Sequence, residues 1–200
     1  FYLDAVQELV PFVDFFKVAS YELLWLDLIS KCSETGKPLI LSTGMATIDE
    51  IIKAIDIARN KNCKDLSLLH CVSGYPTPLD QCNLKALDTL RKLDKDVKVG
   101  WSDHTKKSSI LNRVINFWKA EIIEFHLDLE GNGEEYKSGH CWLPHEISPI
   151  IESTKYFELI DGDGIKQPSP TESLDRNWRA DPKDGMRPLK LLRKNWKPKK

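Results

Sequence analysis

Long apolar runs are missing from this sequence, and neither sign of charge is in excess. No segment approaches the roughly eighteen consecutive apolar residues that a membrane-spanning helix needs. The formal net charge is −1, so the overall charge favours neither a nucleic acid nor a membrane as a partner. Hydrophobic residues make up 41% and charged residues 30%, which is typical of a folded globular protein.

Paired cysteine motifs are also missing. The five cysteines are odd in number and no two form a C-x-x-C pair, which argues against a disulfide framework and against a zinc knuckle. The first residues include neither a methionine nor the basic region of a signal peptide, and their apolar residues have the spacing of an amphipathic helix. We therefore expect a chain that begins inside a larger protein and works in the reducing cytoplasm.

The apolar residues gather instead in five short segments that predict β-strands. These segments are residues 13–19, 38–41, 66–70, 97–101 and 121–127. Each is nearly continuous in apolar residues, which is typical of parallel strands buried on both faces. Segments with helical periodicity separate them, and successive strands begin roughly 24–31 residues apart. The pattern therefore predicts an α/β fold of repeated strand–helix units.

Two architectures accept such repeats, an open doubly wound sheet and a closed TIM barrel. No G-x-G-x-x-G motif follows the first strand, which weakens the dinucleotide-binding version of the open sheet. Polar residues follow nearly every predicted strand, as in a barrel whose active site lies at the carboxyl ends of its strands. We therefore predict a TIM (β/α)8-type barrel. Since a full barrel has eight strands, the five predicted here form a partial barrel with about three units upstream.

Local signals place the remaining boundaries. Thr47 and Glu50 form a capping box ahead of one predicted helix. Glycines between residues 131 and 139 predict a long loop, and one more helix is predicted over residues 145–159. We therefore expect a partial barrel domain in residues 1–160 and an extended polar tail in residues 161–200.

Basic residues cluster near the end of this tail. A solvated surface is the simpler interpretation, and a nucleic-acid-binding patch is the alternative. The cluster consists of Arg187, Lys190, Arg193, Lys194, Lys197, Lys199 and Lys200.

Several of the polar residues at predicted strand ends suit an anionic ligand. Lys17 lies in an apolar strand, where an unpaired ammonium is costly, so it is expected to meet either a ligand's phosphate or carboxylate, or an internal carboxylate. Ser42 and Thr43 come just before a helix start, where backbone amides favour an anion. Ser73 and Tyr75 lie beyond the next strand, within reach of a ligand.

Two histidines at successive strand ends predict a metal site. Adjacent strands lie about 5 Å apart, so His104 and His126 could share one metal ion. Asp103 and Glu124 are close enough in sequence to orient the two rings. The other histidines are expected to be structural or to lie at the surface: His70, His140 and His145.

Taken together, these segments resemble the N-acetylneuraminate (sialic acid) synthase family from about Phe12 to Asp128. They keep the family's order and spacing, and they are specific as a set. The matching segments are residues 17–22 (KVASYE), 38–47 (PLILSTGMAT), 68–78 (LLHCVSGYPTP), 83–87 (NLKAL), 99–105 (VGWSDHT) and 124–128 (EFHLD).

The resemblance implies a TIM-barrel enzyme that condenses phosphoenolpyruvate with N-acetylmannosamine or a related sugar aldehyde and releases phosphate. It implies a divalent metal, Mn²⁺ or else Mg²⁺, on His104 and His126, and it suggests a homodimer. The implied phosphoenolpyruvate contacts are Lys17, Ser20, Ser42, Ser73 and Ser102, and the implied sugar contacts are Glu22 and Tyr75. Of these residues, Lys17 and Glu22 are expected to act in catalysis, Lys17 on the phosphate and carboxylate and Glu22 on the sugar or a proton.

The loop over residues 131–142 departs from the family, which usually has a Gly-Pro-Asp-His sequence after the last strand. This loop contains no clear counterpart of the family's sugar-binding carboxylate. Two alternatives therefore stay open: an aldolase-type condensation on a different aldehyde, and a non-catalytic barrel fragment.

Overall fold

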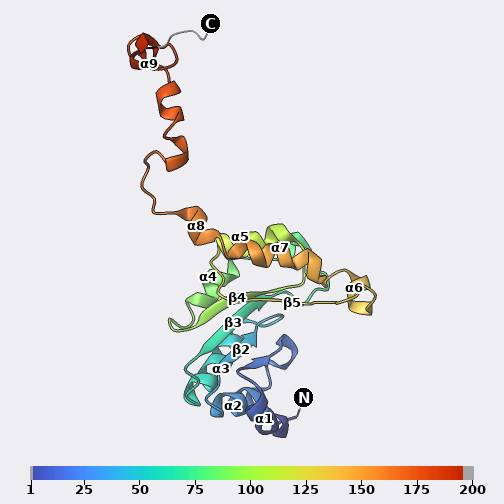
Figure 1. The fold of residues 1–200 in the computed structure, drawn as a ribbon. Coiled ribbons are helices and arrows are strands. Elements are labelled where there is room, and N and C mark those ends of the chain that lie inside the picture. Colours follow the sequence, from blue (N-terminus) through green and yellow to red (C-terminus); the bar gives the residue numbers. More distant parts are fainter. Residues whose placement is uncertain (1, 196–200) are drawn as a thin grey trace. The chain divides into compact units, whose positions relative to one another are not determined.

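The computed structural model describes residues 2–195 of the chain, which divides into two compact units, Phe1–Thr154 and Lys155–Lys200. The first unit is built on one sheet of five parallel strands that lie in chain order (Figure 1). The strands are β1 (Phe16–Val18), β2 (Leu39–Ser42), β3 (Leu66–Cys71), β4 (Lys98–Asp103) and β5 (Ile123–Phe125).

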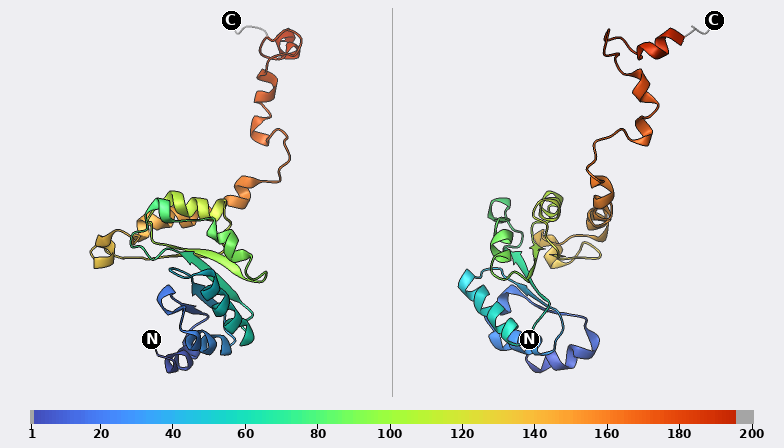
Figure 2. Two further views of the ribbon diagram at one scale, coloured as in Figure 1. Left: turned by 180° about the vertical axis from the view of Figure 1, so that it is seen from behind. Right: turned by 90° about the vertical axis from the view of Figure 1, so that its left-hand side faces the viewer.

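Helices connect successive strands, as the repeated pattern predicts. They lie on the outer side of the curved sheet, which makes the first unit half of a TIM-type barrel (Figures 1 and 2). The α-helices of this unit are α1 (Asp4–Leu9), α2 (Leu26–Glu34), α3 (Ile48–Asn60), α4 (Ala86–Arg91), α5 (Ser108–Asn116), α6 (Glu134–Ser138) and α7 (Pro144–Thr154). Short 3₁₀ helices are η1 (Val10–Phe12), η2 (Ser20–Glu22) and η3 (Leu79–Gln81).

The sheet is strongly curved, and one ion pair measures this directly. Lys17 on β1 and Glu124 on β5 belong to the two outermost strands, yet Lys17 Nζ lies 3.1 Å from Glu124 Oε1. In a flat sheet of this order the two strands would lie about 19 Å apart, beyond the combined reach of the two side chains. The curvature therefore brings the carboxyl ends of all five strands around one concave space, where polar side chains meet.

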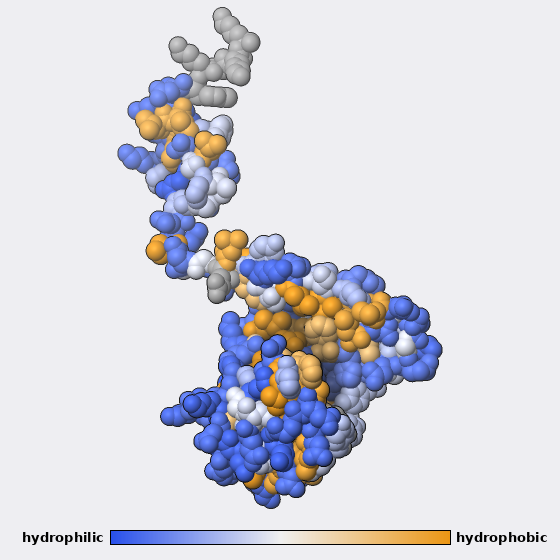
Figure 3. Space-filling view, turned by 60° about the horizontal axis from the view of Figure 1, so that its bottom comes forward, coloured by the Kyte–Doolittle hydropathy of each residue, from blue (hydrophilic) through white to orange (hydrophobic). Residues whose placement is uncertain are grey.

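Buried apolar side chains from the strands and helices form a continuous core in the first unit. Trp101 and Val99 on β4 are fully buried, as are Leu39 and Leu41 on β2. Residues on both faces of the strands are buried, which explains why the strands are nearly continuous in apolar residues. Large apolar side chains also reach the surface, among them Phe12, Phe15, Leu24 and Leu129. Figure 3 shows hydrophobic patches between hydrophilic areas on one face of the molecule.

The predicted capping box begins α3. Thr47 Oγ1 accepts from the backbone N–H of Glu50, and Glu50 Oε2 accepts from the N–H of Thr47 at 2.7 Å. These bonds satisfy amides that have no partner within the helix, and they lower the pKa of Glu50. The box therefore fixes the start of α3, while Thr43 holds the loop after Ser42 to the sheet by donating its N–H and its hydroxyl to the carbonyl of Leu69.

The expected N-terminal helix is present as α1, which ends at Leu9 because Pro11 has no N–H to continue the α-helical bonding and a 3₁₀ turn follows. Another helical prediction is wrong in extent. The helix predicted over residues 145–159 is two helices, α7 and α8 (Phe157–Asp161). At the end of α7, Ser153 and Thr154 donate their hydroxyls to carbonyls three residues earlier, which competes with continued helical bonding.

The second unit consists of short helical segments joined by irregular chain: α8, η4 (Pro170–Glu172), η5 (Asp175–Trp178) and α9 (Lys190–Asn195). Asp181 accepts from the backbone N–H groups of Lys183 and Lys190, and Arg193 pairs with Asp184 at 2.6 Å. Part of the predicted basic cluster is therefore neutralised locally. Lys197, Lys199 and Lys200 lie outside the described residues, and the division at residue 160 stays a prediction.

Two other observations concern the whole described chain. No helix within residues 2–195 is both long enough and apolar enough to cross a membrane. All five cysteines are free and buried: Cys32, Cys63, Cys71, Cys82 and Cys141.

A candidate active site at the carboxyl ends of the strands

The anion-binding residues implied by the sequence come together on the concave side of the sheet. Glu124 Oε1 accepts from Lys17 Nζ and from Ser102 Oγ, each at 3.1 Å. Lys17 therefore has the internal carboxylate partner that the sequence left as one alternative. The Lys17 side chain still keeps 29% of its surface exposed, so its ammonium can be shared with a ligand.

A second group of hydroxyls surrounds Gly44, just after β2. Ser20 Oγ accepts from the backbone N–H of Gly44 at 3.0 Å and lies 3.1 Å from Cys71 Sγ. A Cβ at position 44 would collide with Ser73 Oγ and would lie within 3 Å of the side chains of Ser20 and Cys71. Only glycine therefore allows these three side chains to converge, and burial raises the pKa of the Cys71 thiol, which keeps it neutral.

Three polar atoms at this end of the sheet are buried without a hydrogen-bond partner within the described chain. They are the hydroxyl oxygens of Ser42 and Ser73 and one carboxylate oxygen of Glu22. A buried polar atom without a partner costs on the order of 1–3 kcal/mol, so native proteins rarely keep one unless a ligand, ion or water satisfies it. All three belong to residues that the sequence implied as ligand contacts.

His104 is buried and has one ring nitrogen engaged. Its Nδ1 lies 2.7 Å from the carbonyl oxygen of Val72, which assigns the proton to Nδ1 and leaves the Nε2 lone pair free. Burial lowers the pKa of His104, which favours the neutral ring that binds a metal. The ring centroid lies 5.2 Å from that of His126 and 4.2 Å from that of Tyr75.

The expectation that Asp103 and Glu124 orient the histidine rings is wrong. Asp103 is fully buried and accepts from Trp101, Trp142, the N–H and hydroxyl of Thr105, and the N–H of Lys106. Glu124 is engaged by Lys17 and Ser102. A backbone carbonyl orients His104 instead, and Glu135 lies against His126, with 3.3 Å between Glu135 Oε2 and His126 Nδ1.

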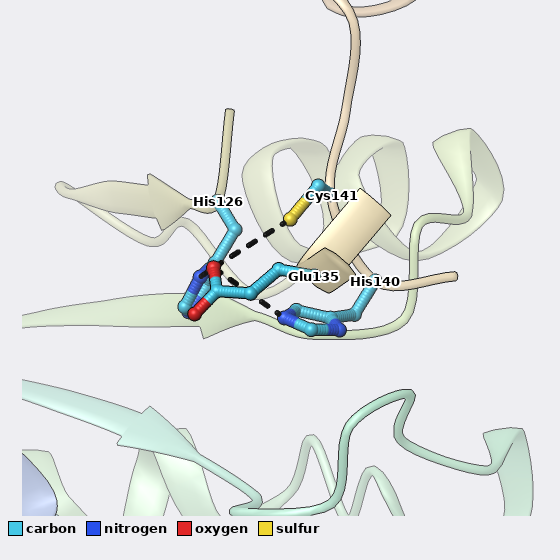
Figure 4. Close-up of side chains that lie close together, drawn as sticks. All are labelled: His126, Glu135, His140 and Cys141. Carbon is cyan, nitrogen blue, oxygen red and sulfur yellow. Dashed lines mark hydrogen bonds and ion pairs between the residues drawn. The ribbon is translucent and has the colours of Figure 1, made fainter. Parts of the chain in front are cut away.

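His126 belongs to a cluster of metal-binding side chains that the sequence did not predict. His126, Glu135, His140 and Cys141 each place one candidate ligand atom within 4.8 Å of the others (Figure 4). The expectation that His140 lies at the surface is wrong, because its side chain is only 5% exposed. Burial and the neighbouring His126 lower the pKa of His140, which favours the neutral ring that binds a metal.

Backbone pairing between distant segments creates this cluster. The N–H of Trp142 donates to the carbonyl of His126, and the N–H of Asp128 donates to the carbonyl of Trp142. The chain after Gly139 therefore runs beside the end of β5 and carries His140 and Cys141 to His126. In the sequence, only the unusual number of metal-binding residue types in the loop could have indicated this.

A half barrel with lysine, serine, glutamate and histidine side chains gathered at its strand ends defines the class of the molecule: a TIM-type α/β protein whose polar groups lie where such barrels carry out chemistry. The model of the NeuB family matches residues 1–166. The chain therefore belongs to the NeuB family.

Individual relatives agree with this assignment. The pseudaminic acid synthase of Helicobacter pylori is 46% identical over 165 residues, which are 82% of this chain and 48% of the relative. The N,N'-diacetyllegionaminic acid synthase of Campylobacter jejuni is 34% identical over 166 residues, which are 81% of this chain and 48% of the relative. The chain thus spans about half the length of the curated relatives it matches.

A solved structure supports the fold. The N-acetylneuraminic acid (sialic acid) synthetase of Leptospira borgpetersenii superposes with a TM-score of 0.68 at 31% identity, over 86% of this chain and 59% of the other. The half barrel is therefore similar to part of a sialic acid synthetase structure.

Proposed function

We propose that this chain provides the phosphoenolpyruvate-binding and metal-binding part of a synthase that condenses phosphoenolpyruvate with an N-acyl-mannosamine-type sugar aldehyde, releasing phosphate and giving a nonulosonic (sialic-type) acid. The observation that carries the proposal is that Ser20, Cys71 and Ser73 converge around Gly44, while Tyr75, two residues after Ser73, packs against both His104 and His126. The similarity to synthases of pseudaminic acid and N,N'-diacetyllegionaminic acid supports the same chemistry.

The hydroxyls that gather near Gly44 suit the anionic substrate, phosphoenolpyruvate. The orphaned oxygens of Ser42 and Ser73 would donate to phosphate or carboxylate oxygens, and Lys17 would supply a positive charge beside them. Glu124 shares Lys17 with the ligand and keeps its ammonium in place. These contacts would hold the enol carbon of phosphoenolpyruvate at a fixed position for attack on the aldehyde.

His104 and His126 would hold a divalent ion, which we propose to be Mn²⁺, with Mg²⁺ as the alternative. The free Nε2 of His104 and the nearby ring of His126 fit such an ion. When bound, it would polarise the aldehyde oxygen. Tyr75 packs against the His104 ring and would contact the sugar, while the unpaired oxygen of Glu22 would accept from a sugar hydroxyl or take up a proton.

In the overall reaction, carbon 3 of phosphoenolpyruvate forms a bond to the aldehyde carbon, water adds to carbon 2, and phosphate leaves.

The proposed function is tested by measuring phosphate release from phosphoenolpyruvate with Mn²⁺, with and without N-acetylmannosamine. The experiment uses the 200-residue chain and a chimaera that adds three upstream strand–helix units from a relative. We expect sugar-dependent release that falls at least 100-fold in His104→Ala. No release from either protein with any N-acyl-mannosamine would contradict the proposal, and a screen of other aldehydes would then test the alternative substrate.

The phosphate site has its own test, which does not need turnover. Gly44→Ala places a methyl group against Ser20, Cys71 and Ser73, so we expect phosphoenolpyruvate affinity to fall about tenfold or more in calorimetric titration. Gly74→Ala is the matched control, because its added Cβ comes no closer than 3.8 Å to any neighbour. An equal loss of phosphoenolpyruvate affinity in both variants would show that the anion binds elsewhere.

The predicted homodimer and the cytoplasmic location are part of the same proposal. Size-exclusion chromatography with light scattering would measure the oligomeric state. Circular dichroism during heating would show whether the chain melts cooperatively. An aggregated chain without a cooperative transition would favour the non-catalytic fragment instead.

A further inference from the structure

The cluster of His126, Glu135, His140 and Cys141 differs chemically from the His104–His126 pair. It combines two imidazoles, one carboxylate and one thiol within a space of 4.8 Å. A thiolate among the ligands selects zinc and similar thiophilic ions, whereas manganese and magnesium complete their coordination with oxygen atoms, including those of water and substrate. The loop therefore brings to His126 a type of ligand that the proposed synthase chemistry does not require.

The distances from the Glu135 carboxylate to the other three ligand atoms are close to those of a tetrahedral site. Glu135 Oε2 lies 3.3 Å from His126 Nδ1, 4.0 Å from His140 Nε2 and 3.9 Å from Cys141 Sγ. Around a zinc ion, with bonds of about 2.0–2.3 Å, neighbouring ligand atoms lie about 3.3–3.7 Å apart. All four ligand atoms lie within 4.8 Å of one another, so closing around an ion requires them to approach by about 1 Å at most. The Glu135 side chain is 71% exposed and is free to move toward the ion.

The surroundings orient the ligands toward one point. Ser138 Oγ lies 3.0 Å from His140 Nδ1, so this nitrogen is engaged and Nε2 faces Glu135. Such a hydrogen bond on the far nitrogen is what sets the tautomer of a metal-binding histidine. Backbone bonds between Trp142 and His126 position the two buried ligands, His140 and Cys141, before any ion binds.

We propose that His126, Glu135, His140 and Cys141 form a four-ligand site for a thiophilic divalent ion of the zinc class. The ion would tie the loop over residues 131–142 to the end of β5. His126 is common to this ligand set and to the His104–His126 pair of the proposed function, whereas His104 is outside the cluster. The two proposed ions share His126 but otherwise depend on different residues, so variants of His104, His140 and Cys141 separate the two proposals.

Cobalt(II) titration of the 200-residue chain tests this site, because a cobalt–thiolate bond gives a charge-transfer absorption in the near ultraviolet. Competition with Zn²⁺ then measures the zinc affinity. We expect the absorption in the unmodified chain and in His104→Ala, and its loss in Cys141→Ser. Zinc affinity should fall at least about 100-fold in Cys141→Ser and in His140→Ala.

Matched controls are Cys63→Ser, which alters a buried thiol outside the cluster, and His145→Ala, which removes an exposed histidine from the start of α7. Thermal melts of all variants would show that each is folded. Cobalt binding without thiolate absorption, or equal zinc affinity in Cys141→Ser and Cys63→Ser, would overturn the proposal. Loss of phosphate release in His104→Ala with zinc binding intact would leave this site standing and concern only the synthase chemistry.

Discussion

At the strand ends, the sequence alone does not show which polar residues are structural and which are available to a ligand. Asp103 and His104 are neighbours, both buried, and both at the end of β4. Asp103 gathers five hydrogen bonds and links β4 to the loop through Trp142, whereas His104 keeps one ring nitrogen free. The first is structural and the second is available to a ligand, because their hydrogen-bond partners differ.

Replacing Asp103 tests its structural role. Asp103→Asn removes the negative charge that five donors share and turns an NH₂ group toward some of them. We expect the free energy of unfolding to fall by about 2–4 kcal/mol, measured by urea denaturation. Asp56→Asn, at an exposed position of α3, is the control and should change it by less than about 0.5 kcal/mol. If Asp103→Asn also changed the free energy of unfolding by less than about 0.5 kcal/mol, the five hydrogen bonds would contribute little to stability.

At the scale of an element, the loop after β5 is held by one carboxylate. Asp128 accepts from the backbone N–H groups of Glu130, Gly131 and Gly133, and a Cβ at Gly133 would collide with it. These bonds lower the pKa of Asp128. Because the loop carries Glu135 and His140, the hydrogen bonds to Asp128 also position the metal-binding cluster.

The lowered pKa predicts how the loop responds to acid. A carboxyl whose pKa is lower in the folded state contributes stability above its unfolded pKa of about 3.9 and loses it as the pH falls through the folded value. We therefore expect amide protection of Glu130, Gly131 and Gly133 to decline over that range, measured by hydrogen exchange. In Asp128→Asn protection should be low at every pH. If amide protection in Asp128→Asn still declined with falling pH as in the unmodified chain, the pH dependence would belong to another titrating group.

At the scale of the first unit, the Lys17–Glu124 ion pair joins the two outermost strands of the curved sheet. Both side chains are about 30% exposed, so solvent screens the pair and its contribution is modest. A double-mutant cycle of Lys17→Met and Glu124→Gln should give a coupling energy of about 0.5–1 kcal/mol in unfolding experiments. A coupling near zero would mean that packing alone sets the curvature.

The sequence by itself determined the parallel strand–helix repeat, the positions of all five strands to within a few residues, and the capping box at Thr47. These features depend on local periodicity and on contacts between residues close together in the chain. The order of polar residues after the strands also sufficed to predict where a site lies, since parallel strands end at one edge.

Only the tertiary structure decided which polar groups meet. Lys17 and Glu124 are 107 residues apart and pair because the sheet curves, and His140 reaches His126 because the chain beside Trp142 returns along β5. Glu124 therefore holds Lys17 and not a histidine ring, and Glu135 and Cys141 join a metal-binding cluster. Such contacts depend on curvature and on pairing between distant segments, and neither leaves a periodic signal in the chain.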